Sequence, residues 1–407
     1  MLQHIYRAYK TELAPDNQQL NGLYRHAGAA RFAYNWGLRW KLNVLEHNKL
    51  PHPRLKSPTA VGLHRELTKL KKSRFSWMYE LSKCVPQEAL WDLEYAFRNF
   101  FVGRARFPRF KGRRRGVGSF RLTGAIRVRP DRVRLPRIGW VRLKERSYLP
   151  SKAHINSATV SERAGRWFVS INVAEEADVP TEVVRPTIGL DRGIEKLLVA
   201  SDGTIVENPR ALKHCQSKLK RLQRDVSRKK KGSKNRRKAV EALARRCYHI
   251  ACVRHDAISK ATTLLARTKS VIVVEDLNVN EMMKNHNLAG SIADAAWSET
   301  FRQLKYKTLW CGSRLVLADR WYPSTKRCSK CGNVKEHMDL SERIYHCDIC
   351  GLIIDRDLNA ARNLEQWPGV ARTLKTPVEG GVQPQMAAQP PYESGTISPT
   401  GPTAMDV

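Results

Sequence analysis

Hydrophobic residues recur at intervals of three and four along two stretches in the first part of the chain. Leu20, Leu23 and Ala27 follow this spacing within residues 17–46, and residues 85–103 repeat it with several aromatic side chains. Such spacing places apolar side chains on one face of a helix. The pattern therefore predicts two helical stretches, preceded by a short strand-like segment at the start of the chain.

After these stretches the hydrophobic period changes to two. Ile126 and Val128 alternate with arginines, and Val133 and Leu135 do the same after a Pro-Asp pair. This alternation predicts a hairpin with one apolar face and one basic face. A second hairpin is expected to turn at residues 163–165. The strands together predict a twisted sheet or small barrel whose solvent face carries arginines, which is typical of a nucleic-acid surface.

The second half of the chain alternates short apolar segments with helical patterns. Residues 187–207 predict two or three strands with tight turns, and residues 271–275 predict a buried strand that ends in an acid. A long helical pair is expected over residues 214–268, an amphipathic helix over 292–312 and a further strand over 314–319. This alternation favours an α/β domain with a mixed sheet.

The net charge of the chain indicates which class of molecule it binds. It carries 73 Lys and Arg against 38 Asp and Glu, a net charge of +35. Such an excess repels itself unless a polyanion is present, and the usual polyanion is nucleic acid. We therefore expect nucleic-acid binding. The residues expected to contact phosphates lie in a Pro/Gly loop, in the first hairpin and between the two long helices: Arg104, Arg106, Arg109, Lys111, Arg113, Arg114, Arg115, Arg127, Arg129, Lys229, Lys230 and Lys231.

Other classes of protein are disfavoured. No apolar run reaches the length of about 18 residues that a membrane span needs, and the N-terminal residues lack the apolar core of a secretory signal. Five of the nine cysteines have no paired spacing and indicate reduced thiols. We expect a cytoplasmic protein of a prokaryote, associated with the nucleoid when bound to DNA. Residues 367–407 are rich in Pro, Gly, Ser and Gln and predict a disordered tail.

Acidic residues follow two of the predicted buried strands. Asp191 comes after the apolar run Thr-Ile-Gly-Leu, Glu275 ends the run Val-Ile-Val-Val, and Asp355 and Asp357 open the last predicted helix. An unpaired carboxylate is costly to desolvate, and carboxylates around Mg²⁺ relieve that cost. Any single acid could instead cap a helix or pair with an arginine. The set, combined with the basic charge, favours a metal-dependent phosphodiesterase, in which two metals activate water and stabilise the leaving oxygen.

Four cysteines form a second candidate site. Cys328 and Cys331 are separated from Cys347 and Cys350 by fifteen residues, and each pair has two residues between its members. This spacing predicts a tetrahedral zinc site. A redox role is disfavoured because two such pairs are present. The site is either a self-contained DNA-binding finger or an insertion within an active site.

The motifs GLDRGI, VVEDLNV, CSKC…CDIC and DRDLNAARN occur in this order. With them the sequence resembles TnpB, a family of insertion-sequence proteins related to type V CRISPR effectors, over about residues 1–366. The resemblance implies an α/β, RNase H-like (RuvC) nuclease with Asp191, Glu275 and Asp357 as catalytic acids that bind two Mg²⁺. Asp355 is the less favoured third acid, and the sequence leaves this choice open.

The resemblance also implies a domain organisation. A wedge β-barrel over residues 1–15 and 116–182 would be interrupted by a helical recognition insert over residues 16–115. The nuclease would comprise residues 183–320 and 352–366. A structural zinc ribbon over residues 321–351, with one Zn²⁺ on its four cysteines, would be inserted in the nuclease.

The implied function is RNA-guided cleavage of double-stranded DNA beside a short adjacent motif. A guide RNA from the transposon end would pair with the target strand, in a complex of one protein with one RNA. Three alternatives remain: a catalytically silent RNA-guided repressor, a transposase of the DDE type, and a zinc-ribbon transcription factor. The three acids disfavour the first, and the cysteines between the last two acids disfavour the second. The acid-ended strands are unnecessary for the third.

Overall fold

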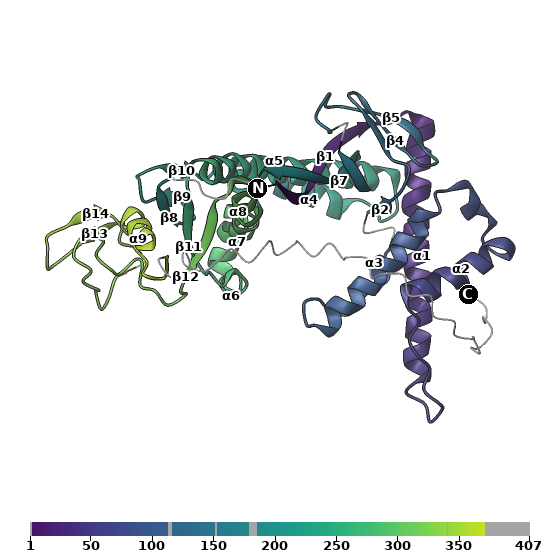
Figure 1. The fold of residues 1–407 in the computed structure, drawn as a ribbon, viewed down its shortest axis with the longest axis horizontal. Helices are drawn as coiled ribbons and strands as arrows, with labels where there is room; N and C mark the ends of the chain where they lie inside the picture. The colour runs from purple at the N-terminus through teal and green to yellow at the C-terminus, as the bar shows by residue number, and fades with distance from the viewer. Residues whose placement is uncertain (1, 113–115, 151–152, 179–184, 340, 371–407) are drawn as a thin grey trace.

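The computed structural model describes residues 2–112, 116–150, 153–178, 185–339 and 341–370. Figure 1 shows them as two sheets with their helices and a small ribbon at one end. A seven-stranded sheet and helices α1–α3 come from the first part of the chain, and a five-stranded sheet with α4–α9 comes from the second. Within these ranges, no helix combines the length and apolar character required to cross a bilayer.

Strand β1 (Leu2–Ala14) is the centre of the seven-stranded sheet. It has thirteen residues, more than the short segment that the pattern predicts. It pairs with β7 (Arg166–Asp178) along most of its length and with β5 (Gly139–Leu143) only at Leu13 and Ala14. The remaining strands are β2 (Ser119–Leu122), β3 (Arg127–Arg129), β4 (Arg132–Leu135) and β6 (His154–Arg163).

The seven-stranded sheet is open. Its order is β2-β6-β7-β1-β5-β4-β3, and no pairing among the described residues joins the edge strands β2 and β3. A closed barrel needs a continuous ring of paired strands. Strand β3 offers only three residues for such a pairing, and the two halves of the sheet are joined only at Leu13 and Ala14. The described residues therefore form an open sheet in place of the predicted barrel.

Both predicted hairpins are confirmed. Strands β3 and β4 pair across a turn at Pro130 and Asp131, with Val133 and Leu135 buried and Arg127 exposed. Strands β6 and β7 turn at Ala164 and Gly165, whose φ angles are 56° and 81°. Two successive positive φ angles are those of the type I′ turn, which matches the twist of paired strands.

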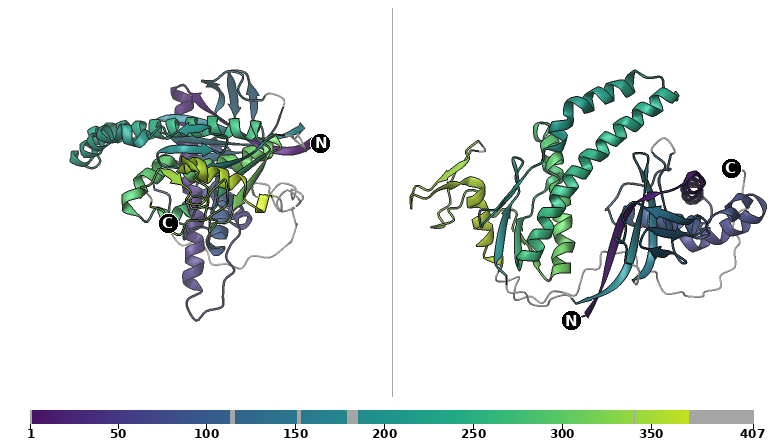
Figure 2. Two further views of the ribbon diagram at one scale, coloured as in Figure 1. Left: turned by 90° about the vertical axis from the view of Figure 1, so that its left-hand side faces the viewer. Right: turned by 90° about the horizontal axis from the view of Figure 1, so that it is seen from above.

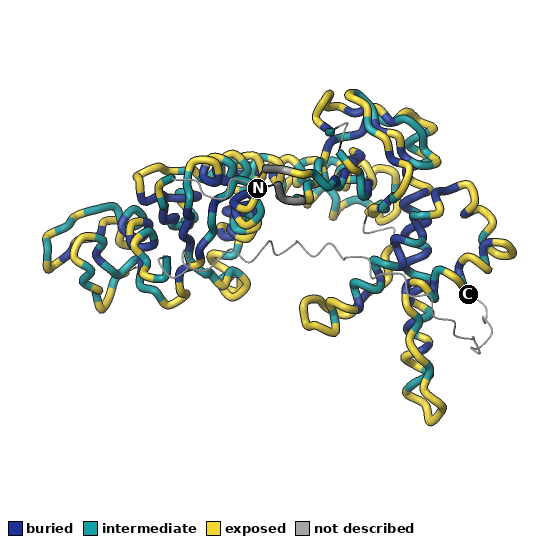
Figure 3. Tube along the Cα trace, in the orientation of Figure 1, coloured by how far each residue is buried: buried dark blue, intermediate teal, exposed yellow. Residues whose placement is uncertain are grey.

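Helices α1 (Asn17–His47) and α3 (Cys84–Phe101) confirm the two helical patterns. They pack closely, because a Cβ added to Gly37 would lie 2.7 Å from Leu90 Cδ2. Along the chain, helix α2 (Ala60–Ser73) and the short helix η1 (Ser76–Glu80) come after α1 and before α3. Figure 3 shows the buried residues gathered where α1 and α3 meet and in the second sheet.

The five-stranded sheet has the order β10-β9-β8-β11-β12. Strands β8, β11 and β12 are parallel to one another, whereas β9 and β10 run antiparallel to their neighbours. These strands confirm the predicted mixed α/β sheet. Their bounds are β8 (Thr187–Asp191), β9 (Lys196–Ala200), β10 (Ile205–Glu207), β11 (Val271–Glu275) and β12 (Arg314–Ala318).

Helices cover both faces of this sheet. Ile272 and Val274 of β11 pack with residues of α5 (Lys234–Thr268) and α8 (Trp297–Cys311), whereas Val271 and Val273 pack with Leu364 of α9. Helix α9 (Arg356–Glu365) touches β8 backbone to backbone, because a Cβ on Gly189 would lie 2.0 Å from Ala361 O. A strand buried on both faces is apolar throughout, as the sequence of β11 is.

The predicted long helical pair is α4 (Ala211–Arg228) and α5. It projects away from the sheet, as the right-hand view of Figure 2 shows. Arg236 of α5 closes the end of α4, with its Nη1 donating to Val226 O at 2.5 Å and Lys229 O at 3.2 Å. The N-terminal sheet contacts the pair through Phe168 and Tyr248, whose ring centroids are 5.7 Å apart.

The single amphipathic helix predicted over residues 292–312 is wrong. Helix α7 (His286–Ala295) ends before Ala296, which has φ 51° and ψ 45°, and α8 begins at Trp297. The break lets Trp297 bury its ring and donate from Nε1 to Gly193 O at 3.1 Å. Helix α6 (Val279–Met282) precedes α7.

The packed chain continues a few residues into the segment predicted to be disordered. Trp367 and Val370 pack against the cluster of Val271, Val273 and Leu364. The rest of that segment, residues 371–407, lies outside the described residues.

Candidate active site and metal centre

Asp191 and Glu275 leave the sheet at the same edge. Each is the last residue of its strand, β8 and β11, and these strands are parallel with Val274 opposite Leu190. The carboxyl ends of adjacent parallel strands are the usual position of a functional site in an open α/β sheet. The structure therefore brings together the two acids that the sequence places at strand ends.

The Asp191 carboxyl is strongly perturbed. Its pKa is raised from 3.8 to about 8, first by burial and then by the negative charges of Glu275 and Asp357. Arg356 and Arg192 oppose this rise without cancelling it. A buried carboxyl that faces two others disfavours its own ionised form. The site is thus short of positive charge, which is the condition that a bound cation would satisfy.

The structure separates the two acids that open α9. Asp355 is the N-cap of the helix, and its Oδ1 accepts from the amides of Asp357 at 3.0 Å and Leu358 at 3.1 Å. Its Oδ2 pairs with Lys196 Nζ at 3.0 Å. Asp357 is instead close enough for its negative charge to raise the pKa of Asp191. Its described ion-pair partner is Arg356, at 3.3 Å. Asp355 is thus engaged as a helix cap and ion-pair partner, and Asp357 stays the predicted third acid.

Two further residues hold Glu275 in place. The Ser324 hydroxyl, buried with 2% exposure, donates to Glu275 Oε1, and Arg192 Nη2 donates to the Glu275 backbone oxygen. Sequence reasoning missed both. Arg192 follows Asp191 directly and could have been suspected, whereas nothing in the local sequence pairs Ser324 with an acid 49 residues earlier.

The acids fit a divalent cation by chemistry. Three partly buried carboxylates supply the oxygen donors that Mg²⁺ prefers. The pKa of Asp191 is raised first by burial and then by the negative charges of Glu275 and Asp357, and a bound cation would oppose both effects. The acids are not drawn together as tightly as the cysteines. In the part of the chain that the structure describes, only the four cysteines form a group whose ligand atoms all lie within 4.8 Å of one another.

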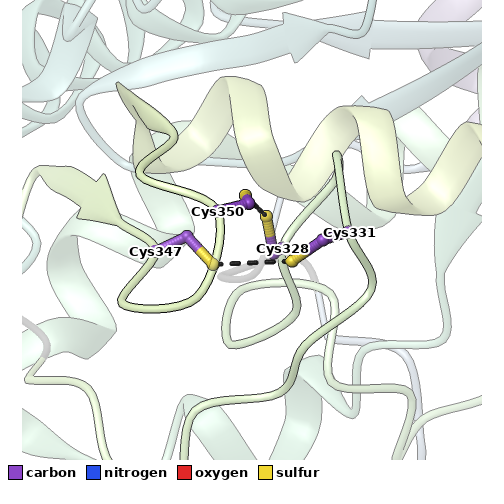
Figure 4. Close-up of side chains that lie close together, drawn as sticks. All are labelled: Cys328, Cys331, Cys347 and Cys350. Carbon is purple, nitrogen blue, oxygen red and sulfur yellow. Dashed lines mark hydrogen bonds between the residues drawn. The ribbon is translucent and has the colours of Figure 1, made fainter.

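The four cysteines converge as their spacing predicts (Figure 4). Cys328 Sγ lies 3.6 Å from Cys350 Sγ, and Cys331 Sγ lies 3.6 Å from Cys347 Sγ. A disulfide would require about 2.05 Å. With Zn–S bonds of about 2.3 Å, a tetrahedral zinc site places its sulfur atoms about 3.8 Å apart. The cluster therefore fits a tetrahedral zinc ion.

Each cysteine pair forms a tight turn of the same kind. The Cys328 amide donates to Asn333 O at 2.7 Å, and the Cys347 amide donates to Leu352 O at 2.9 Å. A glycine with positive φ follows each pair, Gly332 at 81° and Gly351 at 68°. The thiols of the cluster share protons: burial and the other thiols raise the pKa of Cys331, whereas backbone amides of Cys350 and Ile349 lower the pKa of Cys347. The lowered pKa favours the thiolate of Cys347, the form that binds metal.

The cysteine ribbon is docked on the helix that carries Asp357. Asn359 Nδ2 donates to Arg327 O at 2.7 Å, and its Oδ1 accepts from the Ser329 amide at 3.0 Å, so that it holds the backbone on both sides of Cys328. Asn363 Nδ2 reaches Ser324 O at 2.8 Å and Arg327 O at 2.6 Å. Both asparagines are fully buried. The ribbon is thus built into the acid site rather than self-contained.

The hairpin of the ribbon is small and has its own core. Strands β13 (Ile344–His346) and β14 (Ile353–Asp355) pair antiparallel, and Tyr345 is fully buried beside Cys328 and Cys347. The last residue of β14 is the N-cap of α9. The ribbon therefore leads directly into the helix of the third acid.

The predicted phosphate contacts are divided. Arg104, Arg106, Arg109 and Arg127 are exposed. Lys111 and Arg129 are also exposed, but they and Lys229 have partners within the chain. Lys111 Nζ lies 3.9 Å from the Tyr34 ring centroid, Arg129 lies 4.5 Å from that of Trp140, and Lys229 pairs with Asp225. Lys230 and Lys231 are exposed at the tip of the α4–α5 pair, and Arg113, Arg114 and Arg115 lie outside the described residues.

Three family models match the chain. Residues 1–49 match a "Helix-turn-helix domain" of the IS605 OrfB type, residues 170–286 match the IS605 OrfB "Probable transposase", and residues 297–364 match the "Cas12f1-like, TNB domain". The order of these matches defines a transposon-encoded protein with a Cas12f-like C-terminal module.

Curated relatives agree over most of the length. A "Putative RNA-guided DNA endonuclease" of Streptomyces pristinaespiralis is 37% identical, with 89% of this chain and 90% of the relative covered. InsQ of Escherichia coli K12, described in the same words, is 34% identical over 88% and 91%. A "TnpB-like protein" of Acanthamoeba polyphaga mimivirus is 29% identical over 32% and 26%. This chain belongs to the IS605 OrfB/TnpB family.

Solved structures match over similar lengths but superpose poorly. A cryo-EM structure of a Cas12f1–sgRNA–target DNA complex shares 14% identity, with 89% of this chain and 99% of that chain covered and a TM-score of 0.34. The mini-RNA-guided endonuclease Cas_phi3 shares 7% identity over 89% and 92%, with a TM-score of 0.40.

Proposed function

We propose that this chain is an RNA-guided DNA endonuclease encoded by a transposon. The observation that carries the proposal is the position of Asp191 and Glu275 at the carboxyl ends of adjacent parallel strands, with Asp357 of α9 near enough for its charge to raise the pKa of Asp191. The names of its relatives in Streptomyces and Escherichia coli support the guided activity. The net charge of +35 supports a polyanionic guide and target.

The catalytic domain is RuvC-like, with an RNase H fold. Three consecutive antiparallel strands, β8 to β10, are followed by the parallel strands β11 and β12, and acids stand at the ends of β8 and β11. The third acid comes from a helix packed on the central strand β8. This arrangement supports the assignment of the three acids to one nuclease site.

Asp191, Glu275 and Asp357 would hold Mg²⁺, which when bound activates a water molecule and stabilises the leaving oxygen of the phosphodiester. The residues of the chain orient these acids. Ser324 fixes the Glu275 carboxylate, and Arg192 fixes the end of the strand that carries it. The buried surroundings of Asp191 strengthen its attraction for a cation.

The four cysteines would hold one structural Zn²⁺. Their ribbon supplies Ser324 to Glu275 and accepts Asn359 and Asn363 from the helix of Asp357. Zinc would thus keep the second and third acids in register. The zinc site has no open position for substrate, which is typical of structural zinc.

Target sequence would be read by base pairing with the guide RNA, and the protein would contact backbones. Exposed arginines of the loop at residues 104–109 and of β3, together with the lysines at the tip of the α4–α5 pair, are suited to phosphates. Such contacts position nucleic acid without specifying its sequence.

The test is co-expression of the full chain with the DNA that flanks its gene, followed by sequencing of the RNA that co-purifies. The complex is then given a plasmid library and Mg²⁺, with Asp191→Ala as the control. We expect a discrete RNA and Mg²⁺-dependent cutting at matched targets, lost in Asp191→Ala. Specific binding without cutting would support a guided repressor instead. The absence of any specific RNA would contradict the guided function.

A further inference from the structure

Trp321 is the most exposed large hydrophobic side chain among the described residues, at 86%. Its exposure does not come from a loose segment. The Trp321 amide donates to Asp319 Oδ1 at 2.8 Å. The preceding residue, Arg320, donates from Nε to the Asp276 backbone oxygen at 3.1 Å and from Nη2 to Asp276 Oδ2 at 2.5 Å. A tryptophan is usually largely buried. An anchored backbone that presents one to solvent therefore points to a ligand.

The residue on the other side of Trp321 is also fixed. Tyr322 packs against the core cluster beside α9, and its hydroxyl donates to Asn363 O at 3.1 Å. The backbone from Arg320 to Tyr322 is thus held at both ends. Arg320 is bonded to Asp276 and Tyr322 packs in the core, whereas the exposed Trp321 ring has neither kind of contact among the described residues. Its ring is presented in advance of binding, which lowers the entropy cost of binding a flat ligand.

Trp321 lines a hollow close to the proposed acids. The hollow has a volume of about 430 Å³ and is bounded by Asp276, Leu317, Ala318, Asp319, Arg320 and Trp321. Asp276 follows Glu275 directly, and Ala318 pairs with Glu275 across β11 and β12. The hollow therefore lies beside Glu275, at the edge of the sheet where the strands end.

The charged groups of the hollow already have partners, one ion pair and one backbone hydrogen bond. Asp276 is bonded to Arg320, and Asp319 accepts from the Trp321 amide. What remains unpartnered is the aromatic face. On a chain of net charge +35, the flat ligand that suits such a face is a nucleobase, because aromatic stacking accepts any base.

We propose that Trp321 is a stacking platform for an unpaired base of single-stranded DNA at the entrance to the acid site. The inference rests on the proposed nuclease function and names the form in which that site takes its substrate. A base within a duplex is stacked on both sides and offers no face to Trp321, whereas a displaced or unpaired strand does. Guided pairing leaves such a strand beside the protein.

The test measures binding of fluorescent single-stranded DNA to the full chain with its co-purified RNA, in an Asp191→Ala background that prevents cutting. Trp321→Ala should weaken binding about five- to 150-fold, the effect of losing one base stack. Trp321→Phe should recover most of the affinity. Ile344→Ala is the matched control, because Ile344 is a 63% exposed apolar residue of the same ribbon.

A double-substitution cycle identifies the stacked partner. A series of oligonucleotides with one abasic site should contain a position whose loss equals that of Trp321→Ala, and the two losses should not add. Blunt duplex binding and RNA co-purification should be unchanged. Equal weakening of duplex binding, loss of the RNA, or wild-type affinity in Trp321→Ala would each overturn the platform.

Cleavage separates this inference from the proposed function. With Asp191 restored, Trp321→Ala should slow cutting of a matched target while guided binding of that target persists. If the wild-type complex does not cut any target, the proposed function fails, yet the binding comparison still reports on the platform. If the wild type cuts and Trp321→Ala cuts equally fast, the platform fails alone.

Discussion

The hydroxyl of Ser324 donates a hydrogen bond to the carboxylate of Glu275. Ser324 lies four residues before Cys328, the first cysteine of the cluster, and its backbone oxygen accepts from Asn363 of α9 at 2.8 Å. One buried serine therefore connects the strand of the second acid, the cysteine ribbon and the helix of the third acid. Through this contact, the segment that leads into the cysteine ribbon becomes part of the surroundings of Glu275.

Ser324→Ala should slow DNA cleavage about ten- to a hundredfold and leave guided DNA binding intact. A hydrogen bond to a charged group contributes about 1.5–3 kcal/mol, and about 1.4 kcal/mol corresponds to a tenfold change in rate. Single-turnover cleavage at saturating Mg²⁺ measures the effect. The neighbouring Thr325→Ala is the control, and equal rates for the two variants would remove Ser324 from the site.

Asn359→Ala should loosen the zinc site. Its side chain bonds to the Arg327 carbonyl and the Ser329 amide on either side of Cys328. Removing it leaves the part-buried Ser329 amide unpaired, at about 1–3 kcal/mol, and leaves Asn363 as the remaining side-chain partner of the Arg327 carbonyl. We expect a lower unfolding temperature and faster transfer of zinc to a competing chelator. Exposed Arg362 on the same helix gives the control, Arg362→Ala. Unchanged zinc transfer in Asn359→Ala would show that the ribbon holds zinc without the helix.

The features that sequence predicts here are those encoded by neighbouring residues. An apolar run that ends in an acid predicts the strand ends at Asp191 and Glu275, because a strand buried on both faces is apolar throughout. The cysteine spacing predicts the cluster of four thiols, because two short turns suffice to converge them. These elements required no knowledge of distant contacts.

The features that sequence misses depend on distant contacts. Ala296 favours a helix locally, yet it breaks one because Trp297 buries its ring against Gly193, 104 residues earlier. The bond from Ser324 to Glu275 spans 49 residues. The open sheet in place of a barrel has the same origin, since whether β2 meets β3 depends on how β1 pairs with β5 and β7, which lie more than 120 residues later in the chain.

Asp355 and Asp357 should respond to alanine in opposite ways. Asp355→Ala removes an N-cap and the ion pair with Lys196, and loss of an N-cap costs about 0.5–2 kcal/mol of stability. It should retain most of the cleavage rate. Asp357→Ala should abolish cleavage while stability stays equal or rises, because a negative charge near Asp191 is removed. Denaturant unfolding and cleavage of a matched target, measured on both variants, check the pair. Loss of cleavage in Asp355→Ala with activity in Asp357→Ala would reverse the assignment.

Glu299 should make the fold sensitive to acid. Hydrogen bonds from Arg302, and more weakly from Gln303, lower the pKa of Glu299 from 4.5 to about 2 despite its partial burial. The unfolded chain therefore binds this proton first, and the stabilisation present above pH 4.5 is lost as the pH falls toward 2. Because the side chain is 31% exposed, we expect about 1 kcal/mol after solvent screening. Unfolding free energies at pH 5 and pH 3 should differ less in Glu299→Gln than in the wild type. The exposed pair of Glu281 with Lys284 gives the control, Glu281→Gln, which should keep the wild-type difference. An equal difference in Glu299→Gln would show that other groups carry the acid sensitivity.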